Sequence, residues 1–224
     1  MASLSKRIDG NVLVVELARA EQGNALNLEL QQQLAQTWQA YDEADNLRVA
    51  VLHGAPNLFS IGHDVQELAG TASVSAVPAL EMFPLHIGKP VIAAIEGPCY
   101  GLGLELALSC DLRVAGEGAR FGLADPHLYV PYRIATVLLP RMTFMGTSLD
   151  LILSGRILSA VGMNEARLLS QVTPKGGAAA AAVDMARDMA QRFASPLTFR
   201  KRNIWSLSGM PLPAAMNLAR MPRG

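Results

Sequence analysis

Two glycine-containing segments of the sequence, called corners below, have the composition of a ligand-binding site. Residues 59–64 (FSIGHD) follow an apolar run and a turn, and residues 97–103 (GPCYGLG) follow another apolar run and open a helix. Glycine lets a ligand approach the backbone, and the first turn of a helix presents N–H groups that lack a partner within the helix. Each corner alone is more often a structural turn. The chemistry they suit is the binding of an anion by main-chain N–H groups.

One carboxylate stands out because its surroundings are apolar. Glu105 lies in the stretch 102–108 (LGLELAL), which has the character of a buried helix. A carboxylate there either takes part in chemistry or satisfies the N–H groups of a helix N-terminus. The sequence has no GxGxxG, P-loop, HExxH or GxSxG motif, and its four histidines lack metal-ligand spacing. Hydride transfer, phosphoryl transfer, triad hydrolysis and a metal centre are therefore not indicated.

Composition narrows the class of partner. The chain of 224 residues has 19 Lys+Arg, 19 Asp+Glu and 5% aromatic residues, so nothing favours a nucleic acid or an acidic membrane surface. Cys99 and Cys110 are interpreted as buried thiols. No apolar run is long enough to cross a membrane, and none follows the basic N-terminus as in a signal peptide. We expect a soluble cytoplasmic protein.

The elements that must position these residues alternate along the first half of the chain. Buried strands are predicted at 11–17, 49–52, 89–95 and 112–115, with helices between them. The first helix has one apolar face, formed by Leu26, Leu30, Leu34, Trp38 and Tyr41, and Asn27 is its expected N-cap. Further helices are predicted at 101–108, 149–153, 166–169 and 178–193. This order predicts an α/β core with a largely parallel sheet over residues 1–195 and a helical segment over 196–224.

Four segments, in the right order, resemble the crotonase (enoyl-CoA hydratase/isomerase) superfamily. FSIGHDVQEL at 59–68 is similar to F-S-A-G-x-D-L-x-x-L, and KPVIAAIEGPCYGLGLELALSCDLRVA at 89–115 to the family's K-P-V-I-A-A segment with its G-G-G-x-E-L-A. NALN at 24–27 resembles the family's N-A-L-(N/S/D), and LPR at 139–141 followed by LILSGR at 151–156 resembles L-P-R and L-l-L-t-G-r. The resemblance implies a crotonase-like fold of repeated ββα units with a helical C-terminal region, here expected to lack the last helix of many relatives.

The resemblance also implies a catalytic arrangement. It places oxyanion donors at the N–H groups of Ile61 and Leu102, whose side chains are bulkier than the family's alanine and glycine. It places a pair of carboxylates at Glu105 and Asp125, which would hold water, add it to C3 and protonate C2 of a 2-enoyl-CoA. Asp125 precedes Pro126, so it is either this second carboxylate or a turn residue.

Coenzyme A contacts are implied around both corners. They are mostly main-chain contacts, and Arg19 and Lys89 could reach phosphates. The residues are Gln22, Gly23, Asn24, Ser60, Gly62, His63, Asp64 and Gly101. Asp64 is also expected to cap a short helix at 65–68, and His63 is either a pocket residue or a solvent-facing loop residue. No cofactor is implied beyond the CoA thioester itself, and relatives suggest a homotrimer or hexamer.

Three hypotheses remain open from the sequence. The first is a 2-enoyl-CoA hydratase. The second is an enoyl-CoA isomerase, or another acyl-CoA reaction that uses one carboxylate. The third is a CoA-binding relative that has lost catalysis. The acyl chain and the pathway cannot be inferred from the sequence.

Overall fold

The core of the protein is a six-stranded sheet in the order β1-β2-β3-β4-β6-β9. The computed structural model describes residues 3–70, 80–123, 132–192 and 197–220. The strands are β1 (Leu4–Asp9), β2 (Val12–Leu17), β3 (Val49–His53), β4 (Val91–Ile95), β6 (Leu112–Gly116) and β9 (Gln171–Thr173). β1 and β2 form an antiparallel hairpin, and the remaining neighbours are parallel. The four strands and the parallel sheet predicted from apolar runs are confirmed.

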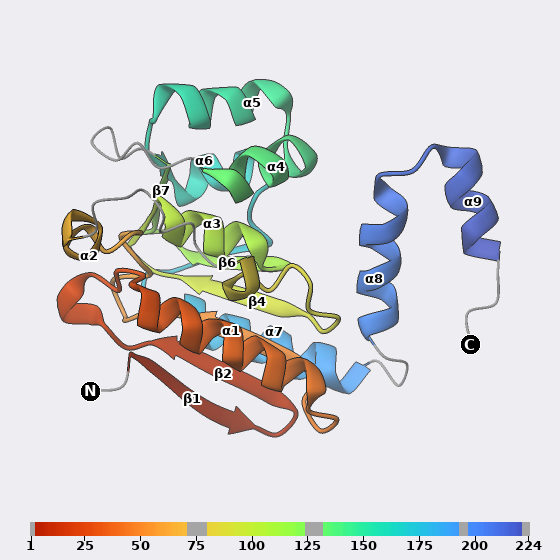
Figure 1. Cartoon of the computed structure of the whole chain (residues 1–224), viewed down its shortest axis with the longest axis horizontal. Helices are drawn as coiled ribbons and strands as arrows, with labels where there is room; N and C mark the ends of the chain where they lie inside the picture. The colour runs from red at the N-terminus through yellow and green to blue at the C-terminus, as the bar shows by residue number, and fades with distance from the viewer. Residues whose placement is uncertain (1–2, 71–79, 124–131, 193–196, 221–224) are drawn as a thin grey trace.

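Helices cover both faces of this sheet (Figure 1). Alternate strand residues divide between the faces, because successive side chains of a strand point to opposite sides. Leu13 and Val15 of β2 belong to the cluster that contains α1 (Leu28–Glu43) and α3 (Leu102–Ser109), whereas Val12 and Val14 pack with α7 (Ala178–Arg192). The helix α1 has the predicted buried face, and the Asn27 side chain accepts a hydrogen bond from the Leu30 N–H at 3.0 Å as its N-cap.

A second sheet of three short strands lies beside α3. It consists of β5 (Pro98–Tyr100), β7 (Arg120–Gly122) and β8 (Leu158–Ser159), with β5 parallel to β7 and β7 antiparallel to β8. The sequence predicted residues 97–103 only as a loop that opens a helix. The structure adds β5 between that corner's first glycine and the helix, so that β4, β5 and α3 follow one another along the chain, with β4 in the six-stranded sheet and β5 in the three-stranded one.

The region after β7 is helical, as predicted, but one helix is placed wrongly. It contains α4 (Arg133–Met142), α5 (Met145–Leu149), a π-helical turn (Asp150–Ser154) and α6 (Ala160–Glu165), so the helix predicted at 149–153 is confirmed. The helix predicted at 166–169 is absent from this described stretch. Arg167 has a positive φ of 60°, and the Leu168 N–H bonds back to the Met163 carbonyl at 3.0 Å. This turn ends α6 and leads the chain into β9.

The two last helices, α8 (Leu197–Ser208) and α9 (Leu212–Arg220), stand apart from the main body in Figure 1. Lys201 ties α8 to the core, because its Nζ donates to Asp111 Oδ2 at 2.8 Å and to the Lys89 carbonyl at 3.1 Å. A cavity of about 330 Å³ lies between α8 and the core. The predicted boundary after residue 195 falls in 193–196, outside the described residues, so the division into core and C-terminal segment stays a prediction. No helix in the described ranges is long and apolar enough to cross a membrane.

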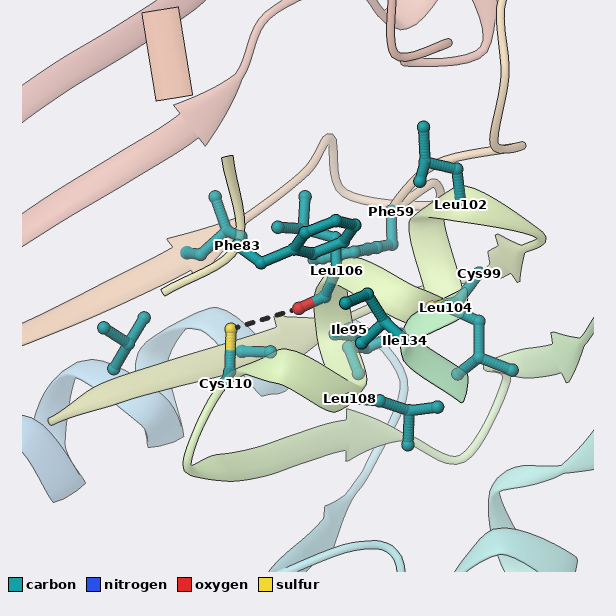
Figure 2. Packing of buried hydrophobic residues seen from close by; sticks show 14 of the residues in the cluster. Phe59, Phe83, Ile95, Cys99, Leu102, Leu104, Leu106, Leu108, Cys110 and Ile134 are labelled. Carbon is teal, nitrogen blue, oxygen red and sulfur yellow. Dashed lines mark hydrogen bonds between the residues drawn. The ribbon is translucent and has the colours of Figure 1, made fainter. Parts of the chain in front are cut away.

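The short α2 (Val65–Gly70) and the 3-10 turns at Ala20–Gln22 and Leu80–Met82 complete the described elements. Figure 2 shows the side chains packed around α3, where Leu102, Leu104, Leu106 and Leu108 lie with Phe59 and Phe83. Cys99 and Cys110 are buried there as free thiols, as predicted. Every residue of α3 is buried, so this helix has a fixed position in the core.

Candidate active site

The two glycine-bearing corners, which are separate in the sequence, lie against each other in the structure. The Ser60 N–H donates to the Pro98 carbonyl at 3.0 Å, and the Ser60 carbonyl accepts from the Tyr100 N–H at 2.9 Å. Segment 59–63 thereby runs alongside β5. On the opposite side of segment 59–63, the Leu26 N–H donates to the Gly62 carbonyl at 2.8 Å. The loop is thus held between segments 23–26 and 98–100.

Closest approach between the corners occurs at Gly62. Its φ of +102° lies in the region that favours glycine, and a Cβ atom there would sit 2.9 Å from the Tyr100 oxygen and 3.2 Å from the Leu102 nitrogen. Gly101, which precedes α3, also has a positive φ, of +51°. Glycine is therefore favoured at Gly62 by both its φ and the close contact with the other backbone, and at Gly101 by its φ alone, since a Cβ atom there would lie 4.0 Å from the nearest atom.

Leu102 presents its main-chain N–H at the N-terminus of α3. As the first residue of the helix it has no intrahelical acceptor, and among the residues that the structure describes no other group accepts this N–H. The Leu102 side chain points into the core and is completely buried (Figure 2). The bulk of this side chain is therefore accommodated among the core residues.

Ile61 does not supply the predicted second donor. Its N–H donates to the Gly23 carbonyl at 3.0 Å, so the amide is engaged within the protein. The next amide, that of Gly62, donates to Ser60 Oγ at 3.1 Å. The side chain of Ile61 is 48% exposed and lies over Gly23, where a Cβ atom would fall 2.6 Å from Ile61 Cδ1. The prediction failed because it ignored segment 23–26, which pairs with the loop.

Glu105 is buried and bound to a different helix from its own. Its Oε1 accepts hydrogen bonds from the Ile134 N–H at 2.8 Å and the Ala135 N–H at 2.9 Å, at the start of α4. Burial raises the pKa of Glu105 from 4.5 to about 7, although these two hydrogen bonds act to lower it. The sequence alternative was that Glu105, in the first turn of its helix, satisfies the N-terminus of that same helix. The structure binds it to the N-terminus of α4 instead, a contact that sequence spacing could not reveal.

The hydrogen bonds to Glu105 Oε1 leave the second carboxylate oxygen, Oε2, available for chemistry. Oε2 accepts no hydrogen bond from any described residue. Glu105 lies three residues after Leu102, in the first turn of α3. Asp125, the predicted second carboxylate, falls in 124–131, outside the described residues.

Several residues at which main-chain contacts to CoA are predicted use their side chains to hold the loop in place, and the contacts to CoA stay a prediction. Asn24 is completely buried with φ of +51°; its Oδ1 accepts from the Arg19 N–H at 2.9 Å and its Nδ2 donates to the Phe59 carbonyl at 3.0 Å. Ser60 is buried and bonded to main-chain groups. Gln22 is exposed, whereas Gly101 is buried. His63 is 8% exposed, so it is not a solvent-facing loop residue.

The charged residues considered for CoA phosphates are likewise engaged within the protein. The Arg19 guanidinium bonds Asp64 Oδ2 at 3.1 Å and the Ala25 carbonyl, and both side chains of this ion pair are mostly buried. Asp64 Oδ1 accepts from the Gln66 N–H at 3.2 Å, which confirms Asp64 as the cap of α2. Lys89 donates to the carbonyls of Tyr41 and Ala44 at 2.9 and 2.6 Å, at the C-terminal end of α1.

Comparison with known proteins agrees with this architecture. The model of the enoyl-CoA hydratase/isomerase family matches residues 7–221. The enoyl-CoA hydratase EchA19 of Mycobacterium tuberculosis is 32% identical over 189 residues, which cover 79% of this chain and 70% of the relative. The 2,3-dehydroadipyl-CoA hydratase of Escherichia coli is 34% identical over 194 residues, covering 84% of this chain and 75% of the relative.

Solved structures give the same result for the fold. A crystal structure of an enoyl-CoA hydratase from Bacillus anthracis superposes with a TM-score of 0.90 at 30% identity, covering 98% of this chain and 88% of that one. A monofunctional enoyl-CoA isomerase from M. smegmatis has a TM-score of 0.81 at 27% identity, covering 96% and 98%. The fold is therefore the crotonase fold, and the chain belongs to the enoyl-CoA hydratase/isomerase family.

Proposed function

We propose that this acyl-CoA-processing enzyme is a 2-enoyl-CoA hydratase, in which the N-terminal end of α3 carries the reaction centre. The proposal rests on one observation. A single buried helix presents both an N–H without an acceptor among described residues, at Leu102, and a carboxylate whose pKa is raised to about 7, at Glu105. Acid–base groups work best when their pKa lies near the operating pH, and burial gives Glu105 such a value.

The chemistry assigns one task to each group. The Leu102 N–H binds the thioester oxygen as it gains negative charge; one such donor is typically worth ~10²–10³ in rate. The Glu105 carboxylate takes a proton from water, whose oxygen bonds to C3, and C2 then receives a proton to give the 3-hydroxyacyl-CoA. By the family resemblance, Asp125 shares the proton transfers with Glu105. The reaction needs no cofactor besides the CoA moiety of the substrate.

Two alternatives have specific support. An isomerase needs only one carboxylate to move a proton between carbons, and Asp125 is one methylene shorter than the family's glutamate and precedes Pro126. A CoA-binding protein without catalysis is favoured by the Ile61 amide, which is engaged by Gly23 rather than available to a ligand. Both alternatives keep the acyl-CoA ligand and change what happens to it.

Hydration of crotonyl-CoA separates the three functions. The loss of absorbance of the conjugated thioester is followed with wild type, Glu105→Gln and Asp125→Asn. Strong loss of rate in both variants supports the hydratase. Loss in Glu105→Gln alone, with 3-enoyl-CoA converted to the conjugated isomer by wild type, supports the isomerase. Binding of CoA measured by calorimetry, without turnover of either substrate, supports the non-catalytic protein.

We also propose that the protein is a homotrimer or hexamer in the cytoplasm. Large apolar side chains are exposed around α5, where Phe144 before the helix is 80% and Leu153 after it 77% exposed, and on α9, where Leu212 is 74% exposed. Such surfaces favour association with further copies. The two free, buried cysteines suit a reducing compartment. Light scattering of wild type and Phe144→Glu tests the assembly: a monomeric wild type would contradict it.

A further inference from the structure

The hydroxyl group of Ser60 connects two main-chain segments inside the protein. The side chain is completely buried. Its Oγ donates to the Asn24 carbonyl at 2.8 Å and accepts the Gly62 N–H at 3.1 Å. The Ser60 main-chain N–H and C=O are bonded to Pro98 and Tyr100. All polar groups of this one residue are therefore used to fix the loop against its neighbours on both sides.

The same side chain packs against the first turn of α3. A Cβ atom added at Gly103 would lie 2.7 Å from Ser60 Cβ and 2.8 Å from Ser60 Oγ. Gly103 directly follows Leu102, whose amide is the proposed oxyanion donor. The position of Ser60 and the position of the α3 N-terminus are therefore linked by direct contact, with no space for either to move independently.

The acceptor of the Ser60 hydroxyl is itself fixed. Asn24 adopts a left-handed backbone conformation, with φ of 51°, which asparagine tolerates better than most residues. Its side chain holds this conformation by bonds to the Arg19 N–H and the Phe59 carbonyl. The Asn24 carbonyl therefore offers the Ser60 hydroxyl a rigid reference point.

We propose that Ser60 is a positioning residue for the oxyanion site. Its hydroxyl accepts the Gly62 N–H, and Gly62 lies close enough to the other corner that an added Cβ atom would be 3.2 Å from the Leu102 nitrogen. The hydroxyl thereby sets the space in which the thioester oxygen meets the Leu102 N–H. This inference rests on the proposed function, since it specifies how that oxyanion site is held. Ser60 touches no substrate atom in this account and acts only through the main chain.

The test is the Ser60→Ala variant, read out with acetoacetyl-CoA. The enolate of this β-ketothioester absorbs in the near ultraviolet, and an oxyanion site stabilises it, so the bound ligand forms enolate at lower pH than the free ligand. We expect Ser60→Ala to raise the pH at which the bound enolate forms and to lower kcat for crotonyl-CoA by about 10- to 100-fold, as for a misplaced catalytic group. The affinity for CoA alone should stay within about twofold, because the hydroxyl contacts main chain only.

The matched control is Ser148→Ala. Ser148 is equally buried and its hydroxyl donates to one main-chain carbonyl, that of Phe144, in α5. Equal effects of Ser60→Ala and Ser148→Ala on the enolate and on kcat would overturn the proposal. If Ser60→Ala does not fold, Ser60→Cys, which keeps a weak hydrogen-bonding group, should give a smaller shift in the same direction, and an unchanged enolate would overturn it. If wild type forms no enolate and hydrates no enoyl-CoA, the proposed function fails instead.

Discussion

Replacing Glu105 by glutamine and by alanine should separate the two roles of its carboxylate. Oε1 accepts two amide hydrogen bonds that start α4, and the side chain is 3% exposed. Glutamine keeps a carbonyl oxygen for those amides but cannot act as a base. Alanine leaves both N–H groups without their acceptor, at a cost of about 1–3 kcal/mol for each buried donor. At about pH 5, where the carboxyl group of the folded protein is protonated, we expect Glu105→Ala to lower the free energy of unfolding by about 2–4 kcal/mol, with little of this loss in Glu105→Gln.

The pH dependence makes this prediction sharper. Folding raises the pKa of Glu105 from 4.5 to about 7, so between these values the folded state binds more protons than the unfolded state. Stability from this group is thus present below about pH 4.5 and is lost as pH rises through about 7. At about 1.4 kcal/mol for each pKa unit, the ionised Glu105 carboxylate destabilises the folded state by about 3 kcal/mol at high pH. Relative to wild type, Glu105→Gln should gain about 2–3 kcal/mol of stability between about pH 5 and pH 8.

Urea unfolding followed by circular dichroism, at one fixed protein concentration, measures these differences. Glu105→Gln should be nearly inactive with crotonyl-CoA at both pH values while being more stable than wild type at the higher one. A stability difference that does not change with pH would refute the buried, titrating carboxylate. Equal destabilisation by glutamine and alanine would refute the assignment of Oε1 to the α4 amides.

Three further outcomes follow from the same contacts. Because the base form of Glu105 is ionised, kcat/KM of wild type should rise with pH and level off above about 7, which a pH–rate profile with crotonyl-CoA measures; an optimum near pH 5 would contradict it. Gly62→Ala should destabilise the protein by about 1–3 kcal/mol or more in urea unfolding, since φ is +102° and the Tyr100 oxygen would lie 2.9 Å from the new Cβ. The control Gly146→Ala, which has open space around the new Cβ, should not destabilise it. Lys201→Met should leave Asp111 buried without its cation and release α8, seen as faster proteolysis between the core and α8.

The central part of the fold could be predicted because its signals are local. β3 and β4 are short apolar runs buried on both faces, and α1 has one continuous apolar face. The edge strand β1 was missed because most of its residues are exposed, so it has no apolar run. β5 was missed because three residues, Pro98–Tyr100, become a strand only by pairing with β7, which comes later in the chain. Pairing between segments that are distant in the sequence leaves no periodic pattern of apolar residues from which the strand could be predicted.

In the candidate site, too, the sequence predicted features that depend on neighbouring residues and missed contacts between distant segments. Leu102 and Glu105 are related by their spacing on one helix, and the sequence placed both at the start of α3. Ile61 was assigned wrongly because the acceptor of its amide, the Gly23 carbonyl, comes from a segment far earlier in the chain. The partners of Glu105 at the start of α4 were unforeseen for the same reason: main-chain amides carry no residue type that a pattern could identify.

The precision that the proposed reaction needs is supplied by the anchoring of α3 at both ends. At its N-terminus, Ser60 packs on Gly103. At its C-terminus, the buried guanidinium of Arg113 donates to the carbonyls of Ala107 and Cys110, and also to Leu168, which ties the helix to the segment before β9. A cation there complements the helix dipole. Electrostatic catalysis requires donors that do not reorganise during the reaction. The Leu102 N–H belongs to a helix that is buried along its whole length and bonded at both ends.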